Sequence, residues 1–135
     1  MIYPEGATTN GEALVYFNKG AFASLRPVQP IVLKYWTLGK IKASQDVLGI
    51  SNHLNVIGLA LAITLRVIEL PVFAPNEYFW KHHWQQGKEE KWEAFARVTR
   101  QIMAEVGGFK LSDLHMQDKF AYKKALSELG KSKKA

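Results

Sequence analysis

Residues 89–108 read Glu-Glu-Lys-Trp-Glu-Ala-Phe-Ala-Arg-Val-Thr-Arg-Gln-Ile-Met-Ala-Glu-Val-Gly-Gly and form the clearest pattern in the chain. Apolar side chains recur every three or four positions, which predicts an amphipathic helix from Glu89 to Val106 with one buried face. The two leading glutamates favour the positive start of this helix, and the two glycines predict its end. On the opposite face Glu93 and Arg97 stand four residues apart, so we expect them to pair.

Strand-like and helix-like segments alternate on the N-terminal side of this helix. Residues 31–35 are β-branched and apolar and predict a strand, as do residues 67–73, where prolines limit the strand to an edge or an end. Residues 51–65 predict an apolar helix, and residues 112–129 predict a last helix. The alternation predicts an α/β fold in one domain, with a few strands flanked by helices.

Composition limits the class of protein. The 135 residues are 47% hydrophobic and 22% charged, which is typical of one globular domain. The net charge of +6 favours anionic partners such as phosphates or an anionic membrane surface. The basic residues are not interleaved with aromatic residues as in a nucleic-acid module, so no nucleic-acid partner is expected.

Several common kinds of site are missing from the sequence. The chain has no cysteine, which excludes a disulfide, a zinc-thiolate site and a thiol nucleophile. No Gly-x-Ser-x-Gly, Walker or Rossmann pattern occurs. His115 and Asp118 share a predicted helical face, but no further ligand stands nearby, so no metal site is expected. A helix over residues 54–65 would cover roughly 18 Å of a roughly 30 Å hydrocarbon core, so no transmembrane span is expected.

The loop at residues 2–11 is the best candidate for a binding site. An apolar start, typical of a strand end, stops at a Pro-Glu-Gly corner and passes into a hydroxyl-rich segment. Glu5 combines a carboxylate with a restrained backbone, and Gly6 allows a sharp turn close to a ligand. Thr8 and Thr9 add hydrogen-bond donors and acceptors. The alternative is an ordinary turn with no ligand.

Three blocks carry a resemblance to a known family. Tyr3–Gly11, Lys19–Phe22 and Pro27–Leu33 follow one another in the order and at the spacing of the glycerophospholipid acyltransferases. The chain most resembles the lysophosphatidylcholine acyltransferase branch, and the resemblance covers nearly its whole length. It implies that residues 1–130 form the C-terminal part of such a domain and that residues 131–135 are a basic tail.

The resemblance also implies where substrate binds. In that family the Pro-Glu-Gly-Thr block contacts the phosphate-bearing acceptor, and the Pro-Val-x-Pro block shapes the acyl-donor or acceptor pocket. The matching substrate-binding residues are Glu5, Gly6, Thr8, Thr9, Pro27, Val28, Gln29 and Pro30. The family threonine corresponds to Ala7, so Thr8 and Thr9 are expected to supply the hydroxyls.

The family's catalytic motif is not found in this sequence. The family uses His-x-x-x-x-Asp upstream of the Pro-Glu-Gly block, with the histidine as general base on the acceptor hydroxyl that attacks the acyl-CoA thioester. The residues five places after the four histidines are Gly58, Gly87, Lys88 and Phe120. No catalytic residue is therefore assigned here, and we expect the chain alone to be inactive.

Two interpretations stay open. In the first, the chain is part of an acyl-CoA-dependent lysophospholipid acyltransferase, and its loop holds the acceptor with a cation from the rest of the enzyme. In the second, it is a non-catalytic structural or lipid-binding subunit of a larger membrane-associated assembly. The expected partners are lysophospholipid, acyl-CoA as co-substrate without another cofactor, a membrane surface of the endoplasmic reticulum or another internal membrane, and a protein that completes the sheet.

Overall fold

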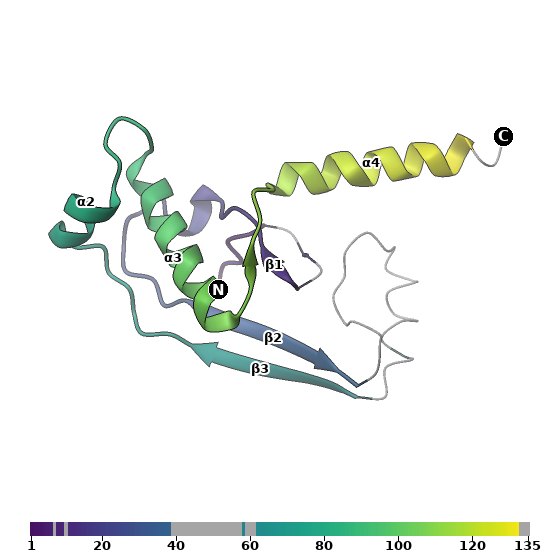
Figure 1. Ribbon diagram of the computed structural model, residues 1–135, viewed down its shortest axis with the longest axis horizontal. Coiled ribbons are helices and arrows are strands. Elements are labelled where there is room, and N and C mark those ends of the chain that lie inside the picture. The colour runs from purple at the N-terminus through teal and green to yellow at the C-terminus, as the bar shows by residue number, and fades with distance from the viewer. Residues whose placement is uncertain (7, 10, 39–57, 59–61, 133–135) are drawn as a thin grey trace.

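The computed structural model describes residues 1–6, 8–9, 11–38, 58 and 62–132. Two small sheets and several helices make up the mixed α/β fold that the sequence predicts (Figure 1). β2 (Ile31–Thr37) pairs antiparallel with β3 (Ile63–Glu69). β1 (Ala13–Leu14) pairs in parallel with β4 (Lys110–Leu111). Residues 1–3 form no strand, so the strand end expected there is wrong.

The central helix α3 (Lys91–Gly107) confirms the clearest prediction. Glu90 is its N-cap, and a capping box joins the Glu90 and Glu93 side chains to each other's backbone N–H groups. At the other end Gly108 has φ 64° and donates to carbonyl groups of the last turn. The left-handed conformation at this position explains the glycine stop seen in the sequence.

The ion pair expected on α3 has a different acidic partner. Glu93 accepts a hydrogen bond from the backbone N–H of Glu90 at 2.7 Å, so its carboxylate is used in capping. Arg97 Nη2 instead lies 2.8 Å from Glu89 Oε1, and the same nitrogen donates to the His83 carbonyl at 2.7 Å. The hydrogen bond from Arg97 lowers the pKa of the Glu89 carboxyl below its ordinary value.

An aromatic cluster forms the core on one side of α3. Phe95 is fully buried, and its ring centroid lies 5.3 Å from those of Phe22 and Phe73 and 6.1 Å from that of Phe79. Phe22 follows the 3₁₀ helix η1 (Lys19–Ala21), so this cluster joins α3 to the chain that precedes β2. It fixes the position of the segment that leads into the hairpin.

The hairpin of β2 and β3 corrects two predictions. The predicted strand 31–35 is confirmed and extends to Thr37, which pairs with Ile63. The second strand begins earlier than expected and ends at Glu69, because Pro30, which faces Leu70, has no N–H to return the hydrogen bond that its carbonyl accepts. Residues 63–65 are strand rather than the end of the predicted helix 51–65, because they pair along β2. The other residues of that prediction, apart from 58 and 62, lie outside the described part of the chain.

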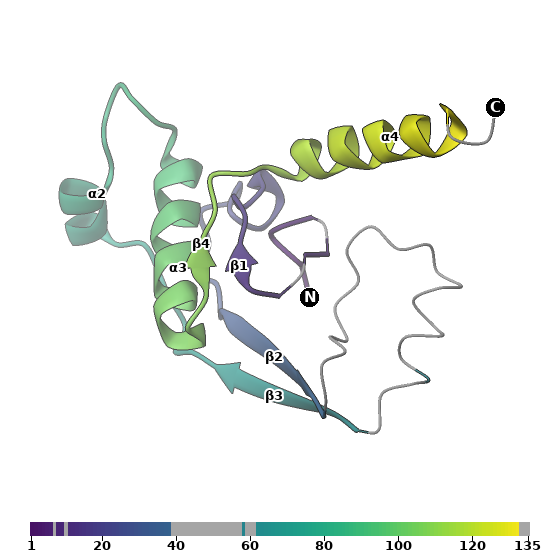
Figure 2. The same cartoon turned by 45° about the vertical axis from the view of Figure 1, so that its right-hand side comes forward.

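Two further helices flank this unit. The sequence did not predict α2 (Glu77–His83), whose N-cap Asn76 accepts a hydrogen bond from the Phe79 N–H at 2.8 Å. The last predicted helix is confirmed as α4 (Met116–Ser132), which starts later than expected. It extends away from the rest of the molecule (Figure 2). Among the described helices, none combines the length and apolar character needed to cross a membrane.

Candidate functional site

A cleft of about 850 Å³ lies between the first loop, β1, β2 and the inner side of α3. Its lining includes six of the eight predicted substrate-binding residues, the polar Glu5, Thr8, Thr9 and Gln29 and the apolar Val28 and Pro30. Gly6 and Pro27 do not line it. The remaining lining is largely apolar and includes Phe17, Phe22, Met103 and Phe109. Two blocks that are separate in the sequence therefore meet at one cavity with a polar and an apolar part.

The Pro-Val-x-Pro block reaches the cleft because it is held in an extended conformation. Its prolines exclude a helix. Val28 exchanges two backbone hydrogen bonds with Phe73, at 2.9 and 2.7 Å. The Pro30 carbonyl accepts from the Leu70 N–H at 3.0 Å, directly ahead of β2. These bonds align the block with the chain that follows β3 and leave its other side toward the cleft.

The Pro-Glu-Gly corner is a hydrogen-bonded turn. The Gly6 N–H donates to the Tyr3 carbonyl at 3.1 Å, and Gly6 has φ 68°, which favours glycine. Asn18 holds the turn from outside. Its side-chain Nδ2 donates to the Glu5 carbonyl at 3.0 Å, and its backbone N–H donates to the Pro4 carbonyl at 2.7 Å. The backbone of this corner is therefore held by hydrogen bonds from Asn18, which follows β1 in the chain.

The Glu5 side chain is half-buried at the cleft wall. Its Oε1 accepts the backbone N–H of Val15 at 3.0 Å. Burial raises the pKa of the Glu5 carboxyl above its ordinary value, although the Val15 hydrogen bond and the positive charge of Arg100 act in the opposite direction. This carboxylate can accept a hydrogen bond from a hydroxyl or orient a cation.

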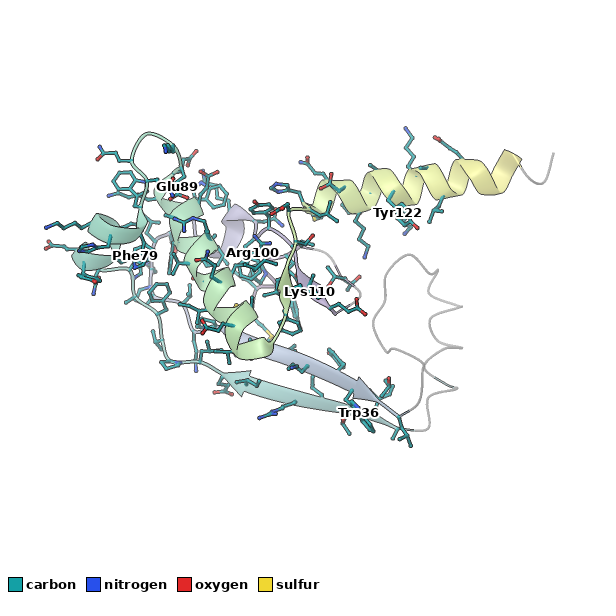
Figure 3. All side chains as sticks on the ribbon, in the orientation of Figure 1. Trp36, Phe79, Glu89, Arg100, Lys110 and Tyr122 are labelled. Carbon is teal, nitrogen blue, oxygen red and sulfur yellow. The ribbon has the colours of Figure 1, made fainter. Side chains whose placement is uncertain are left out.

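Arg100 is a buried cation that influences Glu5 through its charge. Its side chain lies between α3 and the β1–β4 pair (Figure 3) and is only 5% exposed. Nη2 donates to the Leu14 carbonyl at 3.0 Å and to the Ser112 carbonyl, so one nitrogen joins β1 to the segment after β4. The guanidinium also stacks over Tyr16 at 4.4 Å. No role for Arg100 is predicted from the sequence, although its spacing places it on the buried face of α3.

The first turn of α4 contacts the loop through Met116 and Lys119. Lys119 Nζ donates to the Thr8 carbonyl and, at 3.0 Å, to Thr8 Oγ1. Met116 lies beside Gly6, so that a Cβ on this glycine would be 3.0 Å from the Met116 sulfur. The Lys119–Thr8 pair spans 111 residues of sequence, and no local pattern predicted it.

The described histidines lie away from the cleft. His82 and His83 belong to α2, and His115 stacks on Tyr16 with ring centroids 4.4 Å apart. His53 lies outside the described residues. Within the described part of the chain, no group of three or more side chains is arranged to hold a metal ion.

Sequence comparison places the chain among proteins of one class. Over most of its length, it is homologous to a segment of the lysophospholipid acyltransferases. It is 33% identical over 127 residues to lysophospholipid acyltransferase LPEAT1 of Arabidopsis thaliana, an alignment that covers 94% of this chain and 29% of that protein. It is 32% identical over 123 residues to lysophosphatidylcholine acyltransferase 1 of Homo sapiens, which covers 87% of this chain and 21% of that protein. The chain therefore spans less than a third of these relatives. No family model and no solved structure matches it significantly.

Proposed function

We propose that this chain supplies the acceptor-binding part of an acyl-CoA-dependent lysophospholipid acyltransferase. The observation that carries the proposal is the meeting of two sequence blocks at one cleft with a polar wall and an apolar remainder. A lysophospholipid has the same division into a polar head and an acyl chain. The cleft, at about 850 Å³, also has the volume of a typical small-molecule site.

Each part of the cleft has a role in this proposal. Thr8, Thr9 and Gln29 hydrogen-bond the head of the acceptor, and the phenylalanine-rich part contacts its apolar chain. Glu5 contacts an acceptor hydroxyl or orients a cation, since a carboxylate does not attract a phosphate. The general base is the histidine of a His-x-x-x-x-Asp motif outside this sequence. It takes the proton of the acceptor hydroxyl as the oxygen attacks the thioester carbonyl and the coenzyme A thiolate leaves.

The surroundings of the site complete the proposal. Residues 1–130 act as part of a larger acyltransferase domain, and residues 131–135 act as a basic tail. The whole protein works at the surface of the endoplasmic reticulum or another internal membrane. Among the described strands β2 pairs on one side only, and a strand of the larger domain pairs with its other edge.

A chimera tests this function directly. The homologous segment of Arabidopsis LPEAT1 is replaced by this chain, and acyl transfer from labelled acyl-CoA to a lysophospholipid is measured in membranes. We expect an active chimera whose rate falls roughly ten- to hundredfold with Glu5→Ala, because a hydrogen bond to a charged group is lost. Glu105→Ala, which removes an exposed carboxylate of α3, is the matched control. A membrane-inserted but inactive chimera, or full activity with Glu5→Ala, would contradict the proposal.

The second candidate is a non-catalytic lipid-binding subunit, which the missing His-x-x-x-x-Asp motif favours. It predicts that the chain binds lysophospholipid but that the chimera has no activity. Both candidates predict that the isolated chain releases no coenzyme A from acyl-CoA. Release above the level of a Glu5→Ala control would show a base within this chain and would overturn that expectation.

A further inference from the structure

Lys119 places a positive charge on the loop that carries Glu5. We propose that Lys119 binds the phosphate of the acceptor at the rim of the cleft, an inference that rests on the proposed function. From the sequence, this cation is expected to come from the rest of the enzyme. The structure offers one from α4, because the first turn of that helix contacts the loop.

Hydrogen-bond capacity supports this role. A lysine ammonium has three N–H donors, and Lys119 uses two of them on the carbonyl and the hydroxyl oxygen of Thr8. One N–H of Lys119 remains for a ligand. Since Thr8 Oγ1 acts as an acceptor toward Lys119, its own O–H is also left to donate. Thr8 lines the cleft, so these two donors lie side by side at its edge, where a phosphate can accept both.

Lys119 is better placed than the side chains of Arg100 and Lys34 to meet a phosphate at the loop. It is partly buried, so solvent screens it less than a fully exposed lysine. Arg100 is only 5% exposed, and its Nη2 is shared between the carbonyl groups of Leu14 and Ser112, so its burial keeps it from a ligand in the cleft. Lys34 lies 5.7 Å from the centre of the Phe109 ring, at an apolar part of the lining. The neighbouring acid Asp118 accepts the His115 N–H at 2.7 Å and thereby serves the start of α4.

A binding experiment on the purified chain tests the inference without any turnover. The probes are 1-hexanoyl-glycerol 3-phosphate and 1-hexanoyl-glycerol, which share a tail and differ in the phosphate, and inorganic phosphate alone. Titration calorimetry gives the affinity for each. We expect the phosphate to improve binding of the hexanoyl probe about fivefold, as for a partly exposed ion pair. Inorganic phosphate should bind more weakly than the acylated phosphate, because it leaves the apolar part of the cleft empty.

The variants separate Lys119 from general charge. Lys119→Gln should abolish the preference for phosphate, and Lys119→Arg should restore it. Lys123→Gln removes the same charge from an exposed position one turn further along α4, and Lys34→Gln removes it from β2, beside Phe109. Both variants should keep the preference. Amide NMR spectra of Lys119→Gln that match the parent outside residues near the loop establish that the variant is folded.

The outcomes also distinguish this inference from the proposed function. A preference for phosphate that survives Lys119→Gln, or that the parent chain lacks, would overturn the role of Lys119 even if the LPEAT1 chimera is active. A preference that Lys119→Gln removes would support that role even if the chimera is inactive. In that case the acyltransferase proposal fails, and phosphate recognition at the cleft stands.

Discussion

The substitution Gly6→Ala should destabilise the chain through two separable effects. Gly6 has φ 68°, a conformation that costs a residue with a side chain about 1–2 kcal/mol. An added Cβ would also lie 2.6 Å from Asn18 Nδ2 and 3.0 Å from the Met116 sulfur. The Asn18 amide would have to leave the Glu5 carbonyl, which costs a further ~0.5–1.5 kcal/mol for the lost hydrogen bond. The expected loss in the free energy of unfolding is therefore about 1.5–3.5 kcal/mol.

Gly87→Ala is the matched control for backbone strain. Gly87 has φ 83°, and an added Cβ would meet nothing within 4 Å, so this variant should show the backbone cost of about 1–2 kcal/mol alone. Urea unfolding followed by tryptophan fluorescence measures both variants. Asn18→Ala and the double variant Gly6→Ala/Asn18→Ala complete a cycle. The double variant should lose less stability than the two single losses added together, because the collision is gone.

Two results would refute this reasoning. If Gly6→Ala costs no more than Gly87→Ala, then Asn18 and Met116 yield freely and do not hold the corner. If the cycle shows strict additivity, then the amide of Asn18 is not what the new methyl group displaces. Either result would remove the basis for describing the Pro-Glu-Gly corner as fixed from outside.

Two further predictions concern the core and the cleft. Phe95→Ala should lower the free energy of unfolding by about 3–5 kcal/mol, because Phe95 is fully buried among the rings of Phe22, Phe73 and Phe79; a loss below about 1 kcal/mol in urea unfolding would contradict the packing. Since burial raises the pKa of the Glu5 carboxyl, the folded chain binds more protons than the unfolded chain between the ordinary value of 4.5 and the raised pKa. The parent should therefore lose stability relative to Glu5→Gln as the pH rises through that window, and urea unfolding at a series of pH values that shows the opposite trend would contradict the shift.

Local sequence signals predicted the elements whose pattern is complete within a few turns or one strand. The helix α3 follows from its apolar spacing and its glycine stop, and β2 follows from a β-branched run after two prolines. The helix α2 was missed because it is short and depends on the Asn76 cap and the burial of Phe79. Residues 63–65 were misassigned because their apolar character suits a helix or a strand, and only pairing with β2 decides between them.

The candidate site was predictable only in part. The family resemblance indicated eight substrate-binding residues, and the structure places six of them on one cleft. Composition and periodicity alone would not have predicted that the Pro-Glu-Gly and Pro-Val-x-Pro blocks lie at the same cleft. The contacts of Arg100 were not predicted, because an arginine on a buried helical face has no distinctive local pattern. The contact of Lys119 with Thr8 was not predicted, because it depends on the direction in which α4 extends from β4.

The state of Glu5 is the strongest physical reason to regard this loop as a binding site. Burial disfavours the charged carboxylate and raises its pKa, and within the described part of the chain it has one backbone hydrogen bond and no ion pair. Arg100, which is near enough to influence it, is hydrogen-bonded to the carbonyl groups of Leu14 and Ser112. A glutamine could accept the same N–H from Val15 without that desolvation cost. A carboxylate that is kept beside a cleft despite its desolvation cost is expected where a ligand supplies its missing hydrogen-bond partners.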